Sequence, residues 1–195
     1  MATRMLKLSA AAIAIAAFAS GSAINSLLPD REAILNETFP VHGLVNEAVH
    51  IRTGEVSVHD VGVAHAVSRF GTTAHTSAVF LTFTVTYLPN GLETTVAPIE
   101  VEGGNGHVFG GLQAYGGVLS CGGSQAGLPI SCPLAVEISP EALPGARIRI
   151  HNYSSVSGDD VAVIDLGIDD ETAAQLAASD TTFEIGAPTY GGALP

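Results

Sequence analysis

The strongest pattern in this chain is the alternation of residues 79–90, VFLTFTVTYLPN. One set of alternating positions is wholly apolar, and its members are Val79, Leu81, Phe83, Val85 and Tyr87. A period of two, built from β-branched and aromatic residues, predicts a β-strand with one face in a core. The Pro-Asn-Gly sequence at 89–91 ends this strand with turn chemistry. A strand this long and apolar requires a second sheet to cover its inner face.

Further short alternating segments follow the same rule and are separated by turn residues. They lie at residues 54–63, 94–102, 134–138, 147–151 and 161–166. Residues 69–77, RFGTTAHTS, are expected to form a polar, hairpin-like loop. The alternation of residues 54–63 breaks near His59 and Asp60, where a β-bulge would restore it. About seven to eight short strands at this spacing are typical of a β-sandwich. The side chains expected to share the core are Ile148, Ile150, Val161 and Val163, with Ile164 or Leu166.

The chain therefore predicts an all-β fold, an antiparallel β-sandwich of about seven to eight strands with one short C-terminal helix. The helix is expected at residues 170–178, with Asp169 or Asp170 as its N-cap. We expect residues 29–46 to form a linker and residues 47–170 to form the sandwich. Residues 171–195 are expected to form the short helix and a flexible tail.

Residues 1–28 have the composition of a targeting segment. Arg4 and Lys7 precede an uncharged, apolar stretch that is followed by small residues, which is the pattern of a cleaved signal peptide. The alternative is a retained anchor, because residues 8–28 carry no charge and about 20 residues can span a bilayer. In either case this hydrophobic segment contacts the membrane, and the rest of the protein is expected to be extracytoplasmic.

The two cysteines, Cys121 and Cys132, bracket the sequence GGSQAGLPIS. In an oxidising compartment they would form a disulfide bond. The alternative is two unpaired, buried thiols. A bridge across such a short loop stabilises a fold by about 3 kcal/mol in the chain-entropy picture. The spacing is not C-x-x-C, which argues against redox catalysis.

Net charge and residue clusters exclude some functions and weaken others. The net charge is −12 and there is no basic run, so nucleic-acid binding is not expected. One acidic cluster flanks the last predicted strand; it comprises Asp159, Asp160, Asp165, Asp169, Asp170 and Glu171. Such a cluster can hold Ca²⁺, but its spacing is not that of an EF-hand. The simpler interpretation is solvated loop ends and a helix cap, with Asp165 paired to Arg147 or Arg149 across strands.

Histidines are numerous for a chain with so few charges. They are His42, His50, His59, His65, His75, His107 and His151. No pair has a zinc spacing such as H-E-x-x-H, so surface histidines on strands are the default expectation. The sequence GGSQA at 122–126 has alanine where a G-x-S-x-G nucleophile elbow needs glycine. We therefore expect no catalytic residue, no cofactor and no metal, and hence a protein that is not an enzyme.

Three segments together resemble a known family: VFLTFTVTYLPN, GGNGHVF and PLAVEISPEALPGARIRI. They are similar to exported bacterial immunoglobulin-like domains of the telokin-like, or immunoprotective extracellular, type. Residues 159–168 also resemble the end of membrane-tethered actinobacterial proteins. The resemblance covers roughly residues 49–168 and implies an immunoglobulin-like sandwich that acts as an adhesive or binding module at the cell envelope. The lipid-modified cysteine of lipoprotein members is missing, so their mode of attachment is not implied.

The sequence thus predicts a non-enzymatic cell-envelope module that binds another protein, such as an integral membrane partner. Its contact surface is expected at the exposed strand edges and in the glycine-rich segment 110–133. The candidate partner contacts are Tyr115, Leu119, Leu128 and Ile130. Two alternatives stay open: an extracytoplasmic ligand- or metal-ion-binding module that uses the acidic cluster or the histidines, and a hydrolase with an unrecognised site.

Overall fold

A computed structural model of the chain describes residues 38–92, 94–110, 119–152 and 159–192. Residues 38–195 form one compact unit. The predicted signal or anchor segment, residues 1–28, lies outside the described residues. Within the described ranges, no helix is long and apolar enough to cross a membrane.

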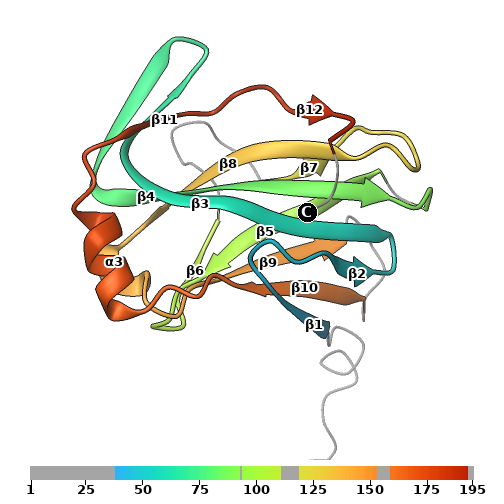
Figure 1. The fold of residues 1–195 in the computed structure, drawn as a ribbon, viewed down its shortest axis with the longest axis horizontal. Helices are drawn as coiled ribbons and strands as arrows, with labels where there is room; N and C mark the ends of the chain where they lie inside the picture. Colours follow the sequence, from blue (N-terminus) through green and yellow to red (C-terminus); the bar gives the residue numbers. More distant parts are fainter. Residues whose placement is uncertain (1–37, 93, 111–118, 153–158, 193–195) are drawn as a thin grey trace, which may run out of the picture. The chain divides into compact units, whose positions relative to one another are not determined.

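The described residues form two sheets that pack face to face (Figure 1). Sheet A has the order β1 (Phe39–Leu44), β10 (Asp160–Asp165), β9 (Arg147–Asn152), β5 (Thr95–Glu102) and β6 (Val108–Phe109), with β7 (Cys121–Gly122) also paired to β5. Sheet B has the order β11 (Thr182–Glu184), β3 (Gly54–Arg69), β4 (Thr72–Pro89), β8 (Ile130–Ile138) and β12 (Thr189–Tyr190), with β2 (Val49–Ile51) also paired to β3. This arrangement confirms the predicted β-sandwich. It has more strands than predicted because five of them are only two or three residues long in the described part of the chain, too short to show a period.

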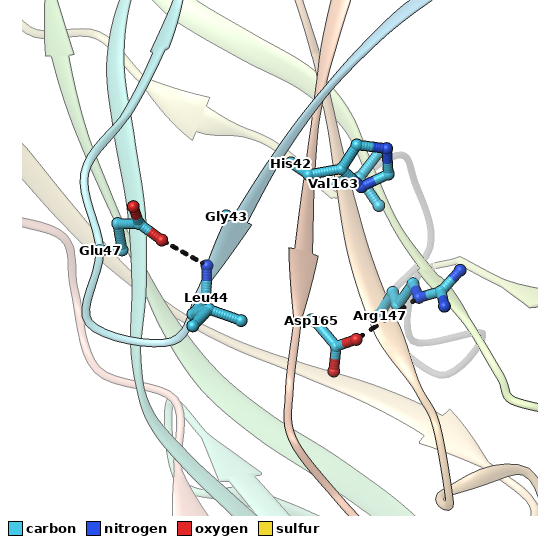
Figure 2. A pocket seen from close by; sticks show the side chains of 7 residues that line it. All are labelled: His42, Gly43, Leu44, Glu47, Arg147, Val163 and Asp165. Carbon is cyan, nitrogen blue, oxygen red and sulfur yellow. Dashed lines mark hydrogen bonds and ion pairs between the residues drawn. The ribbon is translucent and has the colours of Figure 1, made fainter.

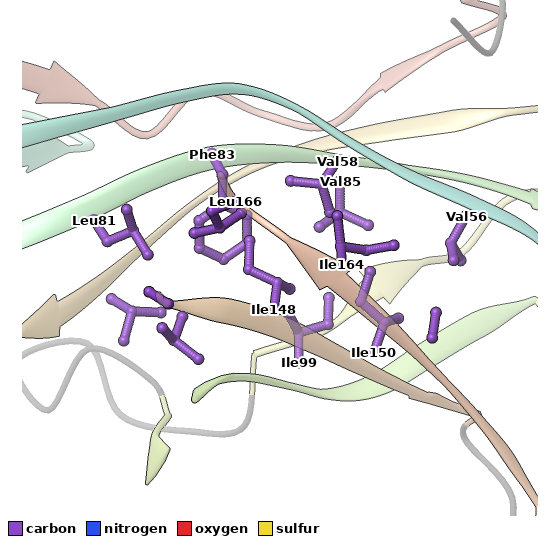
Figure 3. Packing of buried hydrophobic residues seen from close by; sticks show 14 of the residues in the cluster. Val56, Val58, Leu81, Phe83, Val85, Ile99, Ile148, Ile150, Ile164 and Leu166 are labelled. Atoms are coloured by element: carbon purple, nitrogen blue, oxygen red, sulfur yellow. The ribbon is translucent and has the colours of Figure 1, made fainter. Parts of the chain in front are cut away.

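The core lies between the two sheets, and β4 supplies its centre (Figure 3). All five apolar residues of the predicted inner face of β4 are 0% exposed. Opposite them, sheet A contributes Ile99, Ile148, Ile150 and Ile164, each at most 1% exposed. Burial of each such side chain stabilises the fold by roughly 1.5–3 kcal/mol. The predicted core strand and most of its predicted partners are therefore confirmed.

Val161 and Val163 were expected in this core and instead face the outer side of sheet A. The register of β10 with β9 pairs Val163 with Arg149, whereas Ala162 pairs with the core residue Ile150. The sequence VAVI is apolar at every position, so no alternation in it reveals which face points inward.

Strands β3 and β4 form one long hairpin that departs from the prediction in one respect. The expected bulge is present, because the pairing shifts between His59 and Gly62 and Asp60 has a φ of 52°. Residues 69–77, expected as a polar loop, instead continue both strands to a two-residue turn. That turn consists of Phe70, with a φ of 51°, and Gly71, with a φ of 79°. Positive φ at both central positions is the geometry of the tight turns that match the twist of a hairpin.

Both ends of the described chain belong to the sheets rather than to a linker and a flexible tail. Strand β1, which falls in the expected linker, pairs in parallel with β10. Near the C-terminus, β11 pairs in parallel with β3 and β12 pairs antiparallel with β8. The C-terminal segment therefore crosses sheet B from one edge to the other (Figure 1). Ile185 and Phe183 pack there against Val67 and Phe80 in a second, smaller apolar cluster.

The predicted helix is confirmed as α3 (Asp170–Ala177), and a short 3-10 turn, η1 (Pro140–Ala142), precedes β9. Asp169 is the N-cap of α3, and its carboxylate accepts a hydrogen bond of 2.8 Å from the Thr172 N–H. This bond lowers the pKa of Asp169. An aspartate cap satisfies one of the first N–H groups of a helix, which have no partner within it.

Short segments also close the outer edge of β3, which would otherwise offer free backbone groups to another strand. β2 covers its first residues and β11 its last. Between them, the Asn46 N–H donates to the Val58 carbonyl at 2.8 Å, and the Thr181 hydroxyl donates to the Val63 carbonyl at 3.0 Å. Covered edges prevent the sheet-to-sheet association to which open edges are prone.

Replacing Phe83 by alanine should lower the free energy of unfolding by about 3–5 kcal/mol, because the ring is fully buried and its loss leaves a cavity. Denaturant titration followed by far-ultraviolet circular dichroism measures this change. Phe39→Ala is the matched control, since Phe39 is 62% exposed and should lose far less. Equal stabilities for the two variants would contradict the described core.

Candidate binding surface

At one end of the sandwich, several turns meet around the disulfide loop. We call this the loop end; it comprises residues 52–53, 89–92 and 123–129. The predicted disulfide between Cys121 and Cys132 is present. It joins β7 of sheet A to β8 of sheet B, and the two residues are 0% and 3% exposed. The bridge therefore links the two layers covalently and fixes both ends of the loop between them.

Hydrogen bonds hold this glycine-rich loop in one shape. The Gly127 N–H donates to the Pro89 carbonyl at 2.8 Å, which ties the loop to the end of β4. Within the loop, the Leu128 N–H donates to the Gln125 carbonyl at 3.0 Å, and the Ser124 hydroxyl donates to the Leu128 carbonyl at 2.5 Å. The loop is thus ordered by its own backbone as well as by the bridge.

The candidate partner contacts have different surroundings. Tyr115 lies outside the described residues. Ile130 is 0% exposed and belongs to the core, so it is not available to a partner, and its assignment as a contact was wrong. Leu119 is half-buried and packs against the core. Leu128 is 38% exposed and remains a candidate.

Two further exposed residues lie on segments linked to this loop, and neither was predicted from the sequence. Leu92, on the turn after β4, is 66% exposed, and Tyr190, in β12, is 57% exposed. A Cβ placed on Gly91 would lie 3.4 Å from Ala126 of the loop, and the Gly191 N–H donates to the Pro129 carbonyl at 2.9 Å. We call Leu92, Leu128 and Tyr190 the apolar rim. In the sequence, the only sign that Leu92 could be exposed is the Pro-Asn-Gly turn before it. No sequence feature marks Tyr190.

An ion pair joins the two sheets beside the loop end. The Arg52 guanidinium holds the Asp159 carboxylate with both Nε and Nη2, at 2.9 Å and 2.5 Å, and its backbone N–H donates to Asp160 at 2.7 Å. The Arg52 hydrogen bonds lower the pKa of Asp159 to about 2. Two members of the suggested calcium cluster, Asp159 and Asp160, are thus engaged by Arg52. The described residues contain no group of three or more His, Cys, Asp or Glu that could hold a metal ion.

Buried polar groups continue this connection between the sheets. The Thr53 hydroxyl donates to the Asn152 side chain of β9, and the Tyr87 hydroxyl donates to the Thr53 carbonyl at 3.0 Å. The Asn90 side-chain amide donates to the Arg52 carbonyl at 2.7 Å. Buried polar groups that are paired in this way give a region a single geometry.

A shallow pocket of about 370 Å³ opens at the loop end; we call it the end pocket. It is lined by His50, Ile51, Gly54, Glu55, Leu88, Pro89, Asn90 and Gly127. Its lining combines the apolar side chains of Ile51, Leu88 and Pro89 with polar ones, and the only carboxylate among these lining residues is that of Glu55. The Glu55 carboxylate lies 3.3 Å from Nδ1 of His50, an exposed side chain. The end pocket therefore offers apolar walls beside a negative charge.

A second pocket, of about 360 Å³, lies on the outer face of sheet A (Figure 2). Its charged groups face partners within the protein: Nε of Arg147 lies 3.8 Å from Asp165, and Glu47 accepts the Leu44 N–H at 2.9 Å. The Arg147–Asp165 pair is the cross-strand pair that the sequence predicted. Since Glu47 also covers a backbone N–H of edge strand β1, this pocket is best explained as part of how that edge is closed.

A hydrogen-bonded chain of four side chains crosses the outer face of sheet B. Asp60 lies 2.9 Å from Nδ1 of His59, Nε2 of His59 lies 2.9 Å from the Thr86 hydroxyl, and that hydroxyl lies 2.7 Å from Ser131. The order of groups matches an acid, a base and a hydroxyl nucleophile. The Thr86 hydroxyl, however, belongs to a residue only 1% exposed, so a substrate has no access to it. This series of hydrogen bonds instead gives partners to hydroxyl groups that are buried in the sheet.

Burial also shifts the pKa of a histidine on the outer face of sheet A. His151 has a pKa below its ordinary value because burial disfavours the charged ring; Glu100, 3.4 Å from Nε2, opposes this effect, and Arg149 adds to it. Three other histidines have described partners in their own chain: His50 lies beside Glu55, and His59 and His65 contact hydrogen-bonding groups. They therefore act as strand histidines, as the sequence analysis expected.

Comparison with known proteins gives a likeness in fold only. No protein-family model matches the chain, and no curated protein matches it. Among solved structures, it is similar to an uncharacterized beta-sandwich protein from Clostridium difficile, at 10% identity and a TM-score of 0.41. The match covers 71% of this chain and 99% of that one. The resemblance to telokin-like domains therefore stays a prediction.

The native protein should not react with a thiol-labelling reagent, even in the presence of a mild reductant, because both sulfurs are buried. After unfolding and reduction, two thiols per chain should react. Intact-mass measurement counts the labels in each state. Two labels on the unfolded but unreduced chain would contradict the bridge.

Asp159→Asn should destabilise the protein at neutral pH and have a diminishing effect as the pH falls. The folded state holds the pKa of Asp159 near 2, below the ordinary value of 3.8, so its contribution is present above pH 3.8 and is lost between there and pH 2. Denaturant titrations of both proteins across this range measure the difference. Asp170→Asn, at the exposed first turn of α3, serves as the control. A difference that stays constant down to pH 2 would contradict the role of the Arg52–Asp159 pair.

Proposed function

We propose that this sandwich is a non-enzymatic module outside the cytoplasm that binds another protein through its loop end. The observation that carries this proposal is the apolar rim: three exposed, apolar side chains presented by segments that are themselves held rigid. Binding through preordered groups loses little conformational entropy, so a small apolar surface can contribute more of its contact energy to affinity. Tyrosine and other large apolar side chains supply much of the affinity in protein interfaces.

The loop end is the best-supported surface because its shape does not depend on a partner. The disulfide, the loop's own hydrogen bonds and the Arg52–Asp159 pair all converge there. A binding site assembled from turns at one end of a rigid sandwich is a common way to carry recognition on a β-scaffold. The outer pocket of sheet A lacks this support, since its charged groups already pair within the protein.

The proposed location rests on two features of the sequence and one of the fold. The positive N-terminus and the apolar stretch that follows it suit a signal peptide or an anchor at the cell envelope. A disulfide that joins the two sheets suits an oxidising compartment. We propose accordingly that the sandwich functions on the outer side of the membrane, either tethered to it or secreted after cleavage.

The absence of catalysis is part of the same proposal and has its own test. In the Asp60–His59–Thr86–Ser131 chain, Ser131 is the hydroxyl that is partly accessible. A fluorophosphonate probe modifies serines that a neighbouring base has activated. We expect no covalent adduct on this protein by intact-mass measurement. An adduct at Ser131 that His59→Gln abolishes would favour a hydrolase instead.

A photoreactive phenylalanine analogue at position 128 should crosslink the protein to a neighbour in its native envelope, because Leu128 lies on the proposed contact surface. The analogue at position 108 is the matched control: Val108 is also exposed, at 52%, but lies in β6 away from the loop end. Adding Leu92→Ser should reduce crosslinking from position 128 and leave the fold unchanged. Equal crosslinking from both positions, or none from position 128, would argue against the loop end as the contact surface.

A further inference from the structure

The most exposed large apolar side chain among the described residues is Phe70, at the tip of the β3–β4 hairpin. It is 89% exposed and occupies a turn position with a φ of 51°. Asparagine or glycine suits such a position better than a bulky residue, which is strained there. The Arg69 guanidinium lies 5.0 Å from the centroid of the Phe70 ring, within the range of a cation–π contact. The tip therefore presents an aromatic ring together with a positive charge, although a bulky residue makes the turn less stable.

The arm that carries this tip is stiff. Strand β11 pairs with β3 at residues 66–68, so the hairpin has three strands next to its turn. The hairpin also packs on a buried apolar cluster, which is formed by Val67 of β3, Phe80 of β4 and Ile185. Ala74 of β4 packs against this cluster. Figure 1 shows the hairpin projecting beyond the sheets. A projecting element that is braced in this way holds its tip residue in a fixed position.

The tip matches one feature of the same molecule, the end pocket. That pocket has a volume of about 370 Å³, and a cavity of about 150 Å³ is enough to hold a benzene ring. Its walls include Ile51, Leu88 and Pro89, which suit a phenyl ring, and its carboxylate, Glu55, suits an arginine beside that ring. The partner of Glu55 within the chain is His50, whose side chain is 79% exposed. Because His50 is so exposed, an arginine can replace it as the partner of Glu55 with little loss of interaction energy.

The tip and the pocket of one molecule cannot meet. They lie at opposite ends of β3, because Gly54 and Glu55 begin the strand and Arg69 ends it. The strand is 16 residues long, which corresponds to roughly 50 Å. Only a second molecule can therefore bring this tip to this pocket.

We propose that the protein associates head to tail, with Phe70 of one copy inserted in the end pocket of the next and Arg69 paired with Glu55. The two contacting surfaces differ, so each copy keeps one free tip and one free pocket. Such an interface adds copies in a row unless the rotation between them closes a ring. This inference deepens the proposed function, because it names a second copy of this chain as a partner for the loop end.

The first test measures association of the purified full chain, kept in a nonionic detergent, by sedimentation over a range of concentrations. The wild-type chain should form dimers and larger species as its concentration rises. Phe70→Asn should weaken association roughly thirtyfold or more, as expected for loss of a central aromatic residue from an interface. Asparagine suits the turn, so this variant should melt no lower than the wild type, which separates loss of contact from loss of fold.

A charge exchange tests the pairing within the contact. Arg69→Glu and Glu55→Arg should each weaken association, and the variant that carries both should recover it. Recovery in the double variant can come only from these two positions facing each other. Failure of the double variant to recover, although both single variants lose association, would place Arg69 and Glu55 apart and overturn the proposed contact.

Cysteine pairing tests whether the interface is head to tail. Arg69→Cys and Glu55→Cys are prepared as separate proteins, since the native cysteines are already bridged. A disulfide-linked dimer should form when the two are mixed and should be scarce when either is oxidised alone. Val108→Cys mixed with Glu55→Cys is the matched control. Equal dimer formation in the control mixture, or a wild-type chain that stays monomeric at every concentration, would overturn the proposal.

These outcomes separate this inference from the proposed function. If the purified chain is monomeric while position 128 crosslinks to a different envelope protein, self-association is wrong and the loop end still binds a partner. If the purified chain associates and position 128 crosslinks only to other copies, the partner of the loop end is this protein itself. If the chain associates equally well with Asn at position 70, the hairpin tip is not the contact.

Discussion

The buried face of β4 is the constraint on which the rest of the structure depends. Its alternating side chains meet the isoleucines of sheet A, and that contact fixes the separation and the register of both layers. A shift of one residue in β4 would turn five large apolar side chains outward. Because this register is fixed, the turns at the ends of the strands are fixed as well. The loop end is therefore a direct product of core packing, and the disulfide and the Arg52–Asp159 pair only secure what the core has placed.

The edges of the sheets are closed by short and irregular pieces of chain. On β5, the Ile99 N–H donates to the Leu119 carbonyl at 2.9 Å, and β6 and β7 pair with its two ends. On β1, Pro40 has no N–H to offer, and Glu47 accepts the N–H of Leu44. Where these pieces lie, side chains rather than free backbone are left to contact other molecules. That is why the Phe70 tip and the apolar rim are the places to look for recognition.

The sequence predicted the parts of the fold that repeat a period. The β4 alternation, the bulge near His59 and the cap of α3 were all predicted correctly because each follows from local chemistry. The disulfide was predicted from the spacing and setting of Cys121 and Cys132. The orientation of Val161 and Val163 was missed because an unbroken apolar run has no alternation. Strands β1, β11 and β12 were missed because pairing with distant strands, and not their own sequence, makes them strands.

The candidate surface was predicted only in part. Leu128 follows from the disulfide loop, whereas Ile130, two residues further on, belongs to a strand that the sequence did not extend so far. Leu92 and Tyr190 join the surface through tertiary contacts that no local pattern encodes. Phe70 was placed in a loop, and its significance depends on the hairpin that surrounds it.

The path of the C-terminal segment has a consequence for how the chain matures. Strands β11 and β12 pair with opposite edges of sheet B, and they follow every other described strand along the chain. Until they have docked, β3 and β8 expose backbone groups along which neighbouring molecules can pair. The domain therefore reaches its protected state only when this segment lies on both edges. A molecule in which the segment has detached would keep an almost complete core and have two edges open to aggregation.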